Sequence, residues 1–253
     1  MTLDDLALLA PAFAAGLLVL ATHVPLGRQV LARGIIFLDL AIAQVAATGA
    51  LVAGLLLEDA GTGIVQAGAG ISAIIGALAL YAADRRWPEI QEAVIGSTFV
   101  LAATLGLLLL AADPHGGEAL RDALAGQILW ITADQLPALA AVSLLVLGLR
   151  RYGRGMLAGF YLPFAIAVIA SVQVVGVYLV FASLILPALA VRRFDATHGT
   201  VLALATGASG YALGLGVSYA TDLPAGPACV WGLACAALVC GIALGRRTPA
   251  RGR

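Results

Sequence analysis

The chain has 253 residues, of which 62% are apolar and 11% are charged, and its mean hydropathy is +1.02. A soluble domain has about a quarter of its residues charged, so this composition excludes a soluble enzyme, a nucleic-acid-binding protein and a disordered linker. Fourteen basic and fourteen acidic residues cancel, so net charge indicates no charged partner. About 187 residues are apolar or glycine, enough for up to about nine membrane crossings of roughly 20 residues each.

Nine apolar segments follow one another along the chain, separated by charged residues or turn residues. They cover residues 6–25, 34–57, 63–83, 93–112, 126–149, 156–171, 173–191, 200–220 and 226–245. Helices are the expected structure, because strands in a bilayer need a closed barrel and an alternating pattern. The sequence therefore predicts an all-α, multi-pass membrane protein with about eight or nine transmembrane helices. We expect a single transmembrane domain over residues 1–253.

Two of these segments are unusual for a simple crossing. Residues 156–191 must cross twice within 36 residues, so we expect a hairpin that turns near Ser171–Gln173. Segment 126–149 contains several polar residues and Pro137. There we expect a short interfacial helix, a break and a shorter span that starts near Pro137.

The arginines mark one side of the membrane. Thirteen of the fourteen lie after the first, third, fifth and seventh segments or in the C-terminal tail, and Arg121 is the exception. The positive-inside rule then predicts an N-terminus outside and a C-terminus in the cytoplasm, in the inner (plasma) membrane. The chain contains no lysine, so it lacks the Gly-Lys-Ser/Thr loop that binds ATP phosphates.

Asp39 is the clearest functional candidate within the membrane, because an ionisable side chain at that depth is costly. It lies six residues beyond Arg33, about 9 Å deeper at 1.5 Å per residue. Its carboxylate could bind a cation or line a polar pathway, or it could tie two helices together. Gln44 lies near the middle of the same segment, about 140° around the helix from Asp39. We therefore expect these two residues to act separately.

Other polar residues favour structural roles. Asp134 and Asp222 each precede a helix with proline in its first turn, which is typical of N-cap residues. His23, His115 and His198 lie at segment ends or in loops and form no spaced metal-binding set. The three cysteines, all in the last segment, are expected to be packing residues.

We do not expect the chain to be an enzyme. Gly207-Ala208-Ser209-Gly210 has the local form of the nucleophile motif of rhomboid-type intramembrane proteases. No histidine follows His198 to activate that serine. Close packing of small residues explains Gly207–Gly216 better.

Five motifs are distributed over nearly the whole chain. The longest is Gln173-Val-Val-Gly176, followed by an apolar helix and by Pro187-Ala before Arg192 and Arg193. The others are Arg33–Asp39, Glu92-Ala-Val-Ile-Gly96, Gly126-Gln-Ile-Leu-Trp130 followed by Asp134, and Asp222-Leu-Pro-Ala-Gly226-Pro227. In their order along the chain, these motifs resemble those of the zinc/manganese-type ABC importer permease family.

The resemblance implies a permease subunit of an ATP-driven divalent metal importer that works as a homodimer. It further implies a cytoplasmic ATP-binding subunit that hydrolyses ATP and an extracytoplasmic metal-binding protein that delivers the ion. The chain itself is expected to bind no cofactor and no nucleic acid, and the divalent metal is its substrate.

In the second segment, the family usually carries aspartate and, four residues later, histidine, both thought to contact the passing metal. Aligning on Gly49 puts Leu40 at the aspartate position and Gln44 at the histidine position, with Asp39 one residue early. Asp39 and Gln44 are thus the pathway candidates, and Asp39 is the candidate metal ligand. A neutral amide suits harder cations than imidazole does, so the identity of the metal stays open.

The family's ATPase-docking helix precedes the hairpin, and here it shrinks to about Arg150–Gly155. Within Arg150–Phe160, the docking candidates are Arg150, Arg151, Arg154 and Phe160, with Arg85–Glu92 contributing, and arginine–carboxylate pairs are the natural contacts. The short docking segment and Asp39 keep one alternative open, namely a secondary transporter or channel for cations that needs no ATPase.

Overall fold

The computed structural model describes residues 3–56, 61–110, 126 and 128–245. In these ranges the chain forms nine α-helices, two short 3-10 turns and one π-helical turn, and no strand. Seven helical segments of the described part are long and apolar enough to cross a membrane. The prediction of an all-α, multi-pass membrane protein is therefore confirmed.

The helices follow the apolar segments of the sequence closely. In chain order they are α1 (Leu3–Arg33), α2 (Leu38–Leu56), α3 (Thr62–Arg86), α4 (Gln91–Leu110), α6 (Leu136–Tyr152), α7 (Leu162–Val175), α8 (Val177–Ala190), α9 (Ala196–Thr221) and α10 (Ala225–Gly245). The short turns are η1 (Pro88–Ile90), η2 (Ile128–Trp130) and η3 (Leu157–Tyr161). The short helix, break and shorter span expected in residues 126–149 correspond to η2, the turn after it, and α6.

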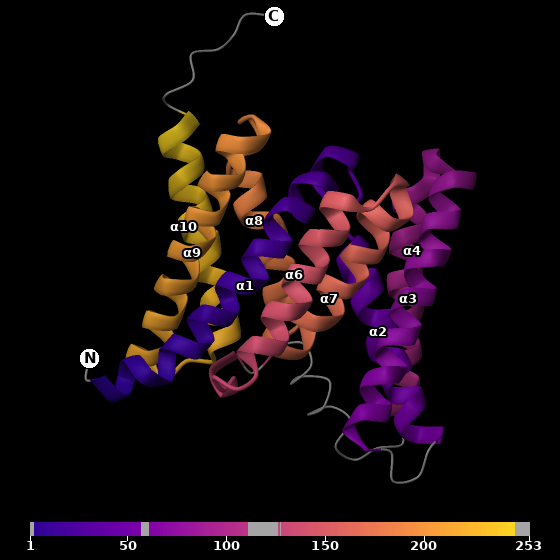
Figure 1. Cartoon of the computed structure of the whole chain (residues 1–253), viewed down its shortest axis with the longest axis horizontal. Coiled ribbons are helices and arrows are strands. Elements are labelled where there is room, and N and C mark those ends of the chain that lie inside the picture. The colour runs from indigo at the N-terminus through magenta and orange to yellow at the C-terminus, as the bar shows by residue number, and fades with distance from the viewer. Residues whose placement is uncertain (1–2, 57–60, 111–125, 127, 246–253) are drawn as a thin grey trace, which may run out of the picture.

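The helices form two groups with a layer between them (Figure 1). One group is α2, α3 and α4, the other is α8, α9 and α10, and α1, α6 and α7 lie in the middle of the view. α1, α3, α6 and α8 all finish at the same end of the bundle (Figure 1). We call it the arginine end, because the arginine pairs at 85–86, 150–151 and 192–193 follow or finish these helices.

The hairpin between α7 and α8 turns at Gly176, just beyond the expected Ser171–Gln173. Gly176 has a φ of 78°, a left-handed conformation that favours glycine. Gly126 has a φ of 70°, and a Cβ atom there would lie 2.2 Å from the carbonyl oxygen of Val175. Two of the motif glycines therefore pack directly against each other. α8 has 14 residues, or about 21 Å of helix against a hydrocarbon core of about 30 Å, so the count of eight or nine crossings stays a prediction.

The N-cap roles expected of Asp134 and Asp222 are wrong. α6 begins after Gln135, and Asp134 lies in the preceding turn, where a hydrogen bond with Thr132 holds the pKa of its carboxyl below the usual value. Asp222 ends α9 in a left-handed conformation with a φ of 55°. In both places the helix begins later than the aspartate, so its first N–H groups are out of reach of that carboxylate.

Small residues bring α9 close to its neighbours, as the sequence predicted. A Cβ atom at Gly207 would lie 2.5 Å from the Leu20 side chain of α1, and one at Gly214 would lie 2.3 Å from the Cα atom of Cys229 in α10. Of the three cysteines predicted to be packing residues, Cys229 is buried as expected, whereas Cys240 is half-buried and Cys235 is exposed, and all three thiols are free. The hydroxyl of Ser209 donates to the carbonyl oxygen of Thr206 at 2.9 Å.

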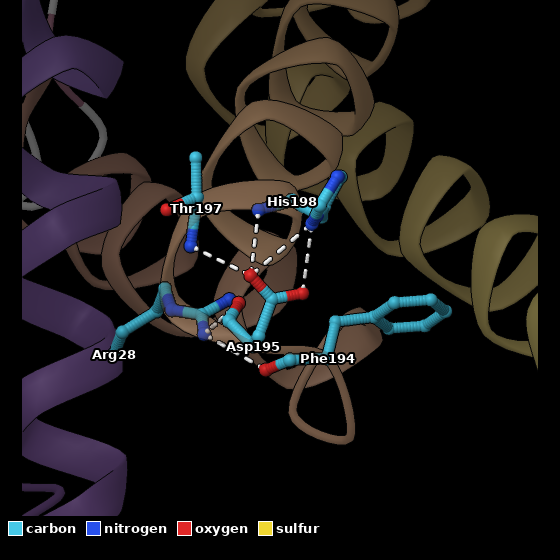
Figure 2. A network of polar contacts seen from close by, with 5 residues as sticks. All are labelled: Arg28, Phe194, Asp195, Thr197 and His198. Carbon is cyan, nitrogen blue, oxygen red and sulfur yellow. Dashed lines mark hydrogen bonds and ion pairs between the residues drawn. The ribbon is translucent and has the colours of Figure 1, made fainter.

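Arg28 joins α1 to the start of α9 at the arginine end (Figure 2). Its guanidinium donates to the carbonyl oxygens of Phe194 at 3.0 Å and Asp195 at 2.8 Å. Asp195 is the N-cap of α9, and it accepts from the backbone N–H groups of Thr197 and His198. The backbone N–H of His198 contributes most to holding the pKa of the Asp195 carboxyl below its usual value.

Candidate functional site

A groove of about 700 Å³ lies between the two helix groups. Leu40 and Gln44 of α2 and Phe99 of α4 line one wall, and the aromatic residues Tyr178, Phe181 and Trp231 of α8 and α10 stand on the other. Gln44, Tyr178 and Trp231 contribute the polar side-chain atoms of the lining, and none of the lining residues is charged. The lining of the groove is thus mainly apolar, with few polar side chains.

Leu40 and Gln44 lie one helical turn apart on α2 and line the groove together. These are the positions at which the family resemblance places aspartate and histidine. Asp39 is not among the groove-lining residues: its side chain is only 1% exposed and lies inside the protein. Asp39 and Gln44 therefore occupy different sides of α2, as their helical spacing predicted.

Asp39 lies in the first turn of α2. Neither of its carboxylate oxygens has a hydrogen-bond partner of good geometry among the described residues. The positive end of the α2 helix dipole is the favourable feature of this environment for a carboxylate. The contacts of the described residues give no support to the alternative in which Asp39 ties two helices together. These contacts leave the Asp39 carboxylate free to bind another group.

The docking candidates gather at the arginine end, at the end of α6 and in the turn after it. Arg151 and Arg154 are exposed, and Arg150 is half-buried. The guanidinium of Arg151 lies 5.6 Å from the ring centre of Tyr152. Phe160 differs from the arginines, because it is 2% exposed and lies beneath the guanidinium of Arg33 at 4.2 Å. Phe160 therefore anchors this turn to α1 rather than presenting a surface for a partner.

His23 is buried within α1, and its expected position at a segment end is wrong. The helix continues through Pro25 to Arg33, whereas the apolar segment was expected to end near residue 25. Proline is tolerated in membrane helices, because neighbouring groups can satisfy the carbonyl it leaves free. The Nδ1 atom of His23 lies 3.0 Å from the carbonyl oxygen of Val19 and 3.0 Å from Oγ1 of Thr22.

Sequence reasoning also missed Tyr161, which is fully buried at the arginine end. Its hydroxyl accepts a hydrogen bond from Nε2 of Gln91 at 2.6 Å. These two residues are 70 positions apart, and periodicity relates only residues of the same helix. The one sequence signal nearby is the pair of successive aromatic residues at 160–161.

The described part of the chain contains no group of three or more histidine, cysteine, aspartate or glutamate residues placed to hold a metal ion. For an ion that enters the groove, the oxygen atoms available from its lining side chains are those of Gln44 and Tyr178. Both are neutral, so they can replace water around an ion without balancing its charge.

Comparison with known proteins agrees with this architecture. The sequence pattern of a family described as "ABC 3 transport family" matches residues 5–158 and 152–244. A "Probable metal transport system membrane protein" of Chlamydia muridarum (strain MoPn / Nigg) is 26% identical over 185 residues. That match covers 63% of this chain and 62% of the relative, so the chain spans less than two thirds of the relative's length.

The solved structure of PsaBC from Streptococcus pneumoniae in complex with Fab has a similar fold. The two chains superpose with a TM-score of 0.70 at 21% sequence identity. The superposition covers 97% of this chain and 98% of the other. The similarity thus extends over all the helices described above.

Proposed function

The chain belongs to the ABC 3 transport family, and from that premise we propose that it is the membrane permease subunit of an ATP-driven importer of a divalent metal ion. One observation carries the proposal: Leu40 and Gln44, which the family resemblance aligns with its expected metal contacts, line a groove between two helix groups. The description of the Chlamydia relative as a probable metal transport protein supports the same cargo.

In this proposal the metal ion passes along the groove after an extracytoplasmic binding protein has delivered it. The oxygens of Gln44 and Tyr178 replace part of its water shell. Since both groups are neutral, the ion binds weakly and leaves readily, as conduction through a membrane requires. Asp39, at the buried start of α2 and on a different side of that helix from Gln44, can supply a negative charge to the passing ion.

ATP hydrolysis belongs to a separate cytoplasmic subunit in this proposal, because the chain has no lysine to complete a phosphate-binding loop. The arginine end faces that subunit, in agreement with the positive-inside rule. The exposed side chains of Arg151 and Arg154 can each bind a carboxylate of the ATPase with two parallel hydrogen bonds.

We further propose that two copies of the chain form the permease. Several apolar side chains beside the groove are exposed in the single chain, among them Leu107 and Trp231. A second copy that packed against this face would cover them. It would also bring a second Gln44 to the passage, which doubles the number of amide oxygens available to the ion.

Transport into vesicles tests this function. The permease is reconstituted with a candidate ATPase subunit and a candidate binding protein, and uptake of radioactive Mn²⁺ and Zn²⁺ is measured with and without ATP on the side of the membrane that the ATPase faces. We expect uptake that depends on ATP and on the binding protein. Equal uptake without ATP would favour the secondary transporter or channel instead. Failure to move either ion would contradict the metal cargo.

A further inference from the structure

The turn that leads from α6 into α7 is a π-helical turn, and its sequence explains why. Pro163 has no N–H group, and in an α-helix its ring would clash with the carbonyl group of Gly159 four residues earlier. The backbone widens instead, and the N–H of Leu162 bonds to the carbonyl oxygen of Leu157, five residues back. Such turns occur frequently at functional sites.

The widened turn directs two successive aromatic rings into the protein. Phe160 and Tyr161 are 2% and 0% exposed, and their ring centres lie 5.3 Å apart with the rings edge to face. Phe160 lies beneath Arg33, the last residue of α1. Tyr161 meets Tyr81 of α3 edge to face at 5.6 Å. These contacts fix η3 to two other helices.

The hydroxyl of Tyr161 links η3 to α4. It accepts from Nε2 of Gln91, the first residue of α4, at 2.6 Å. Its own hydrogen then remains free for the Asp84 carboxylate, which faces the same hydroxyl. The Tyr161 hydroxyl can therefore accept one hydrogen bond, from Gln91, and donate another, to Asp84.

Glu92, the next residue of α4, continues this link to α2. Its carboxylate faces the backbone N–H groups of Ile36 and Phe37, which immediately precede α2, although Oε2 has no hydrogen-bond partner of good geometry among the described residues. Gln91 and Glu92 are adjacent in the chain, so the start of α4 is bonded to η3 on one side and lies against the start of α2 on the other. α2 and α4 together form the groove wall that carries Leu40, Gln44 and Phe99.

The docking segment is in tight contact with η3. A Cβ atom at Gly153 would lie 2.5 Å from the carbonyl oxygen of Ala158, so the backbone at the end of α6 touches the backbone of η3. A displacement of Arg151 and Arg154 is therefore passed directly to the π-helical turn.

We propose that Tyr161, Gln91 and Glu92 are positioning residues that transmit movement of the docking segment to the α2–α4 wall of the groove. This inference rests on the proposed function, since it requires an ATPase that moves the docking segment. In this proposal the π-helical turn changes between two arrangements, because rewinding by one residue would rotate Tyr161 away from Gln91. The hydrogen bond between Tyr161 and Gln91 is then present in one arrangement and absent in the other.

The test uses Tyr161→Phe, which removes the hydroxyl and keeps both ring contacts. The reconstituted permease–ATPase complex is assayed for Mn²⁺ uptake and for phosphate release in the same vesicles. We expect normal ATPase binding and thermal stability, with Mn²⁺ uptake per ATP hydrolysed reduced about fivefold or more. Tyr211→Phe serves as the matched control, because it also removes a buried phenol hydroxyl, which lies 2.8 Å from the Ser183 hydroxyl and outside the docking segment and the groove lining.

A second variant removes the same hydrogen bond from the side of its donor, Gln91. Gln91→Met has a similar length and no hydrogen-bond donor, and it should lower the ratio in the same direction as Tyr161→Phe. The double variant should add little to Tyr161→Phe, because that change already removes the hydrogen bond to Gln91. An unchanged ratio in both single variants, or a loss of thermal stability that accounts for the lower uptake, would overturn the inference while the wild-type protein still transported. Absence of ATP-dependent uptake in the wild type would instead overturn the proposed function, and this inference with it.

Discussion

Replacing Asp39 by asparagine should change stability and transport in opposite directions. The carboxyl group is 1% exposed and has no hydrogen-bond partner of good geometry among the described residues. A buried charged group without a partner costs on the order of 1–3 kcal/mol or more. Asparagine has nearly the same shape and no charge, and it gives up only about 0.3–1 kcal/mol of attraction to the helix dipole. The variant should therefore be as stable as the wild type or more stable.

The loss of transport follows from charge and distance. Gln44 lies five residues further along α2, about 7.5 Å in rise, and on the other side of a helix about 10 Å across. An ion beside Gln44 is thus roughly 12 Å from Asp39, where a divalent cation and a carboxylate attract by about 2–3 kcal/mol at an effective dielectric constant of about 20. Removing that attraction should lower metal uptake about tenfold or more.

Two measurements on the same preparation test this reasoning. The melting temperature in detergent should stay constant or rise by a few degrees, and ATP-driven uptake of Mn²⁺ or Zn²⁺ should fall while expression stays normal. Asp222→Asn is the matched control, because Asp222 is exposed in a left-handed conformation that asparagine adopts readily. A lower melting temperature with unchanged uptake would mean that Asp39 braces the helices and does not act in transport.

Four further variants give predictions that differ in kind. Gln44→His should raise uptake of Zn²⁺ relative to Mn²⁺ in a competition assay, since imidazole is a strong zinc ligand; an unchanged ratio would remove Gln44 from the pathway. Replacing Arg151 and Arg154 together by alanine should weaken co-purification with the ATPase without lowering the melting temperature, and undiminished binding would place the interface elsewhere. Gly126→Ala should destabilise the protein by more than about 1 kcal/mol, because its φ is positive and a Cβ there meets a backbone oxygen. Gly54 lies in α2, and a Cβ atom added there would have no neighbour within 4 Å. Gly54→Ala should therefore be neutral or stabilising by about 0.4–1 kcal/mol. Equal melting temperatures for Gly126→Ala and Gly54→Ala would refute this contrast.

The helices could be predicted because their signal is local and strong. Apolar runs bounded by charges give the approximate bounds of α2, α3, α4, α9 and α10, since a bilayer requires about 20 apolar residues for each crossing. Helix ends were harder where local rules compete. The first apolar segment was expected to end near residue 25, and its helix in fact continues to Arg33. Asp134 and Asp222 have the sequence pattern of N-caps, and one or two residues of turn separate each from the helix it was expected to cap.

Only those features of the candidate site that depend on spacing within one helix could be predicted. Spacing alone placed Asp39 and Gln44 on different sides of α2, because the angle per residue is fixed in a helix. The hydrogen bond between Tyr161 and Gln91 joins residues that no periodic pattern relates. The opposite wall of the groove, with Tyr178 and Trp231, depends on how the two helix groups pack. Such contacts are set by tertiary packing and could not be read from the chain.

The chemistry of the groove has a consequence for metal selectivity. A side chain discriminates between zinc and manganese by the softness and charge of its ligand atom, and the lining oxygens of Gln44 and Tyr178 are hard and neutral. On the proposed function, such a wall passes either ion with little preference, so selection falls to the protein that delivers the metal. The wild-type permease should then transport Zn²⁺ and Mn²⁺ in the ratio in which the binding protein holds them. Exchanging that protein for one of different metal preference should change the imported ion, whereas a fixed import ratio would show that the permease itself selects.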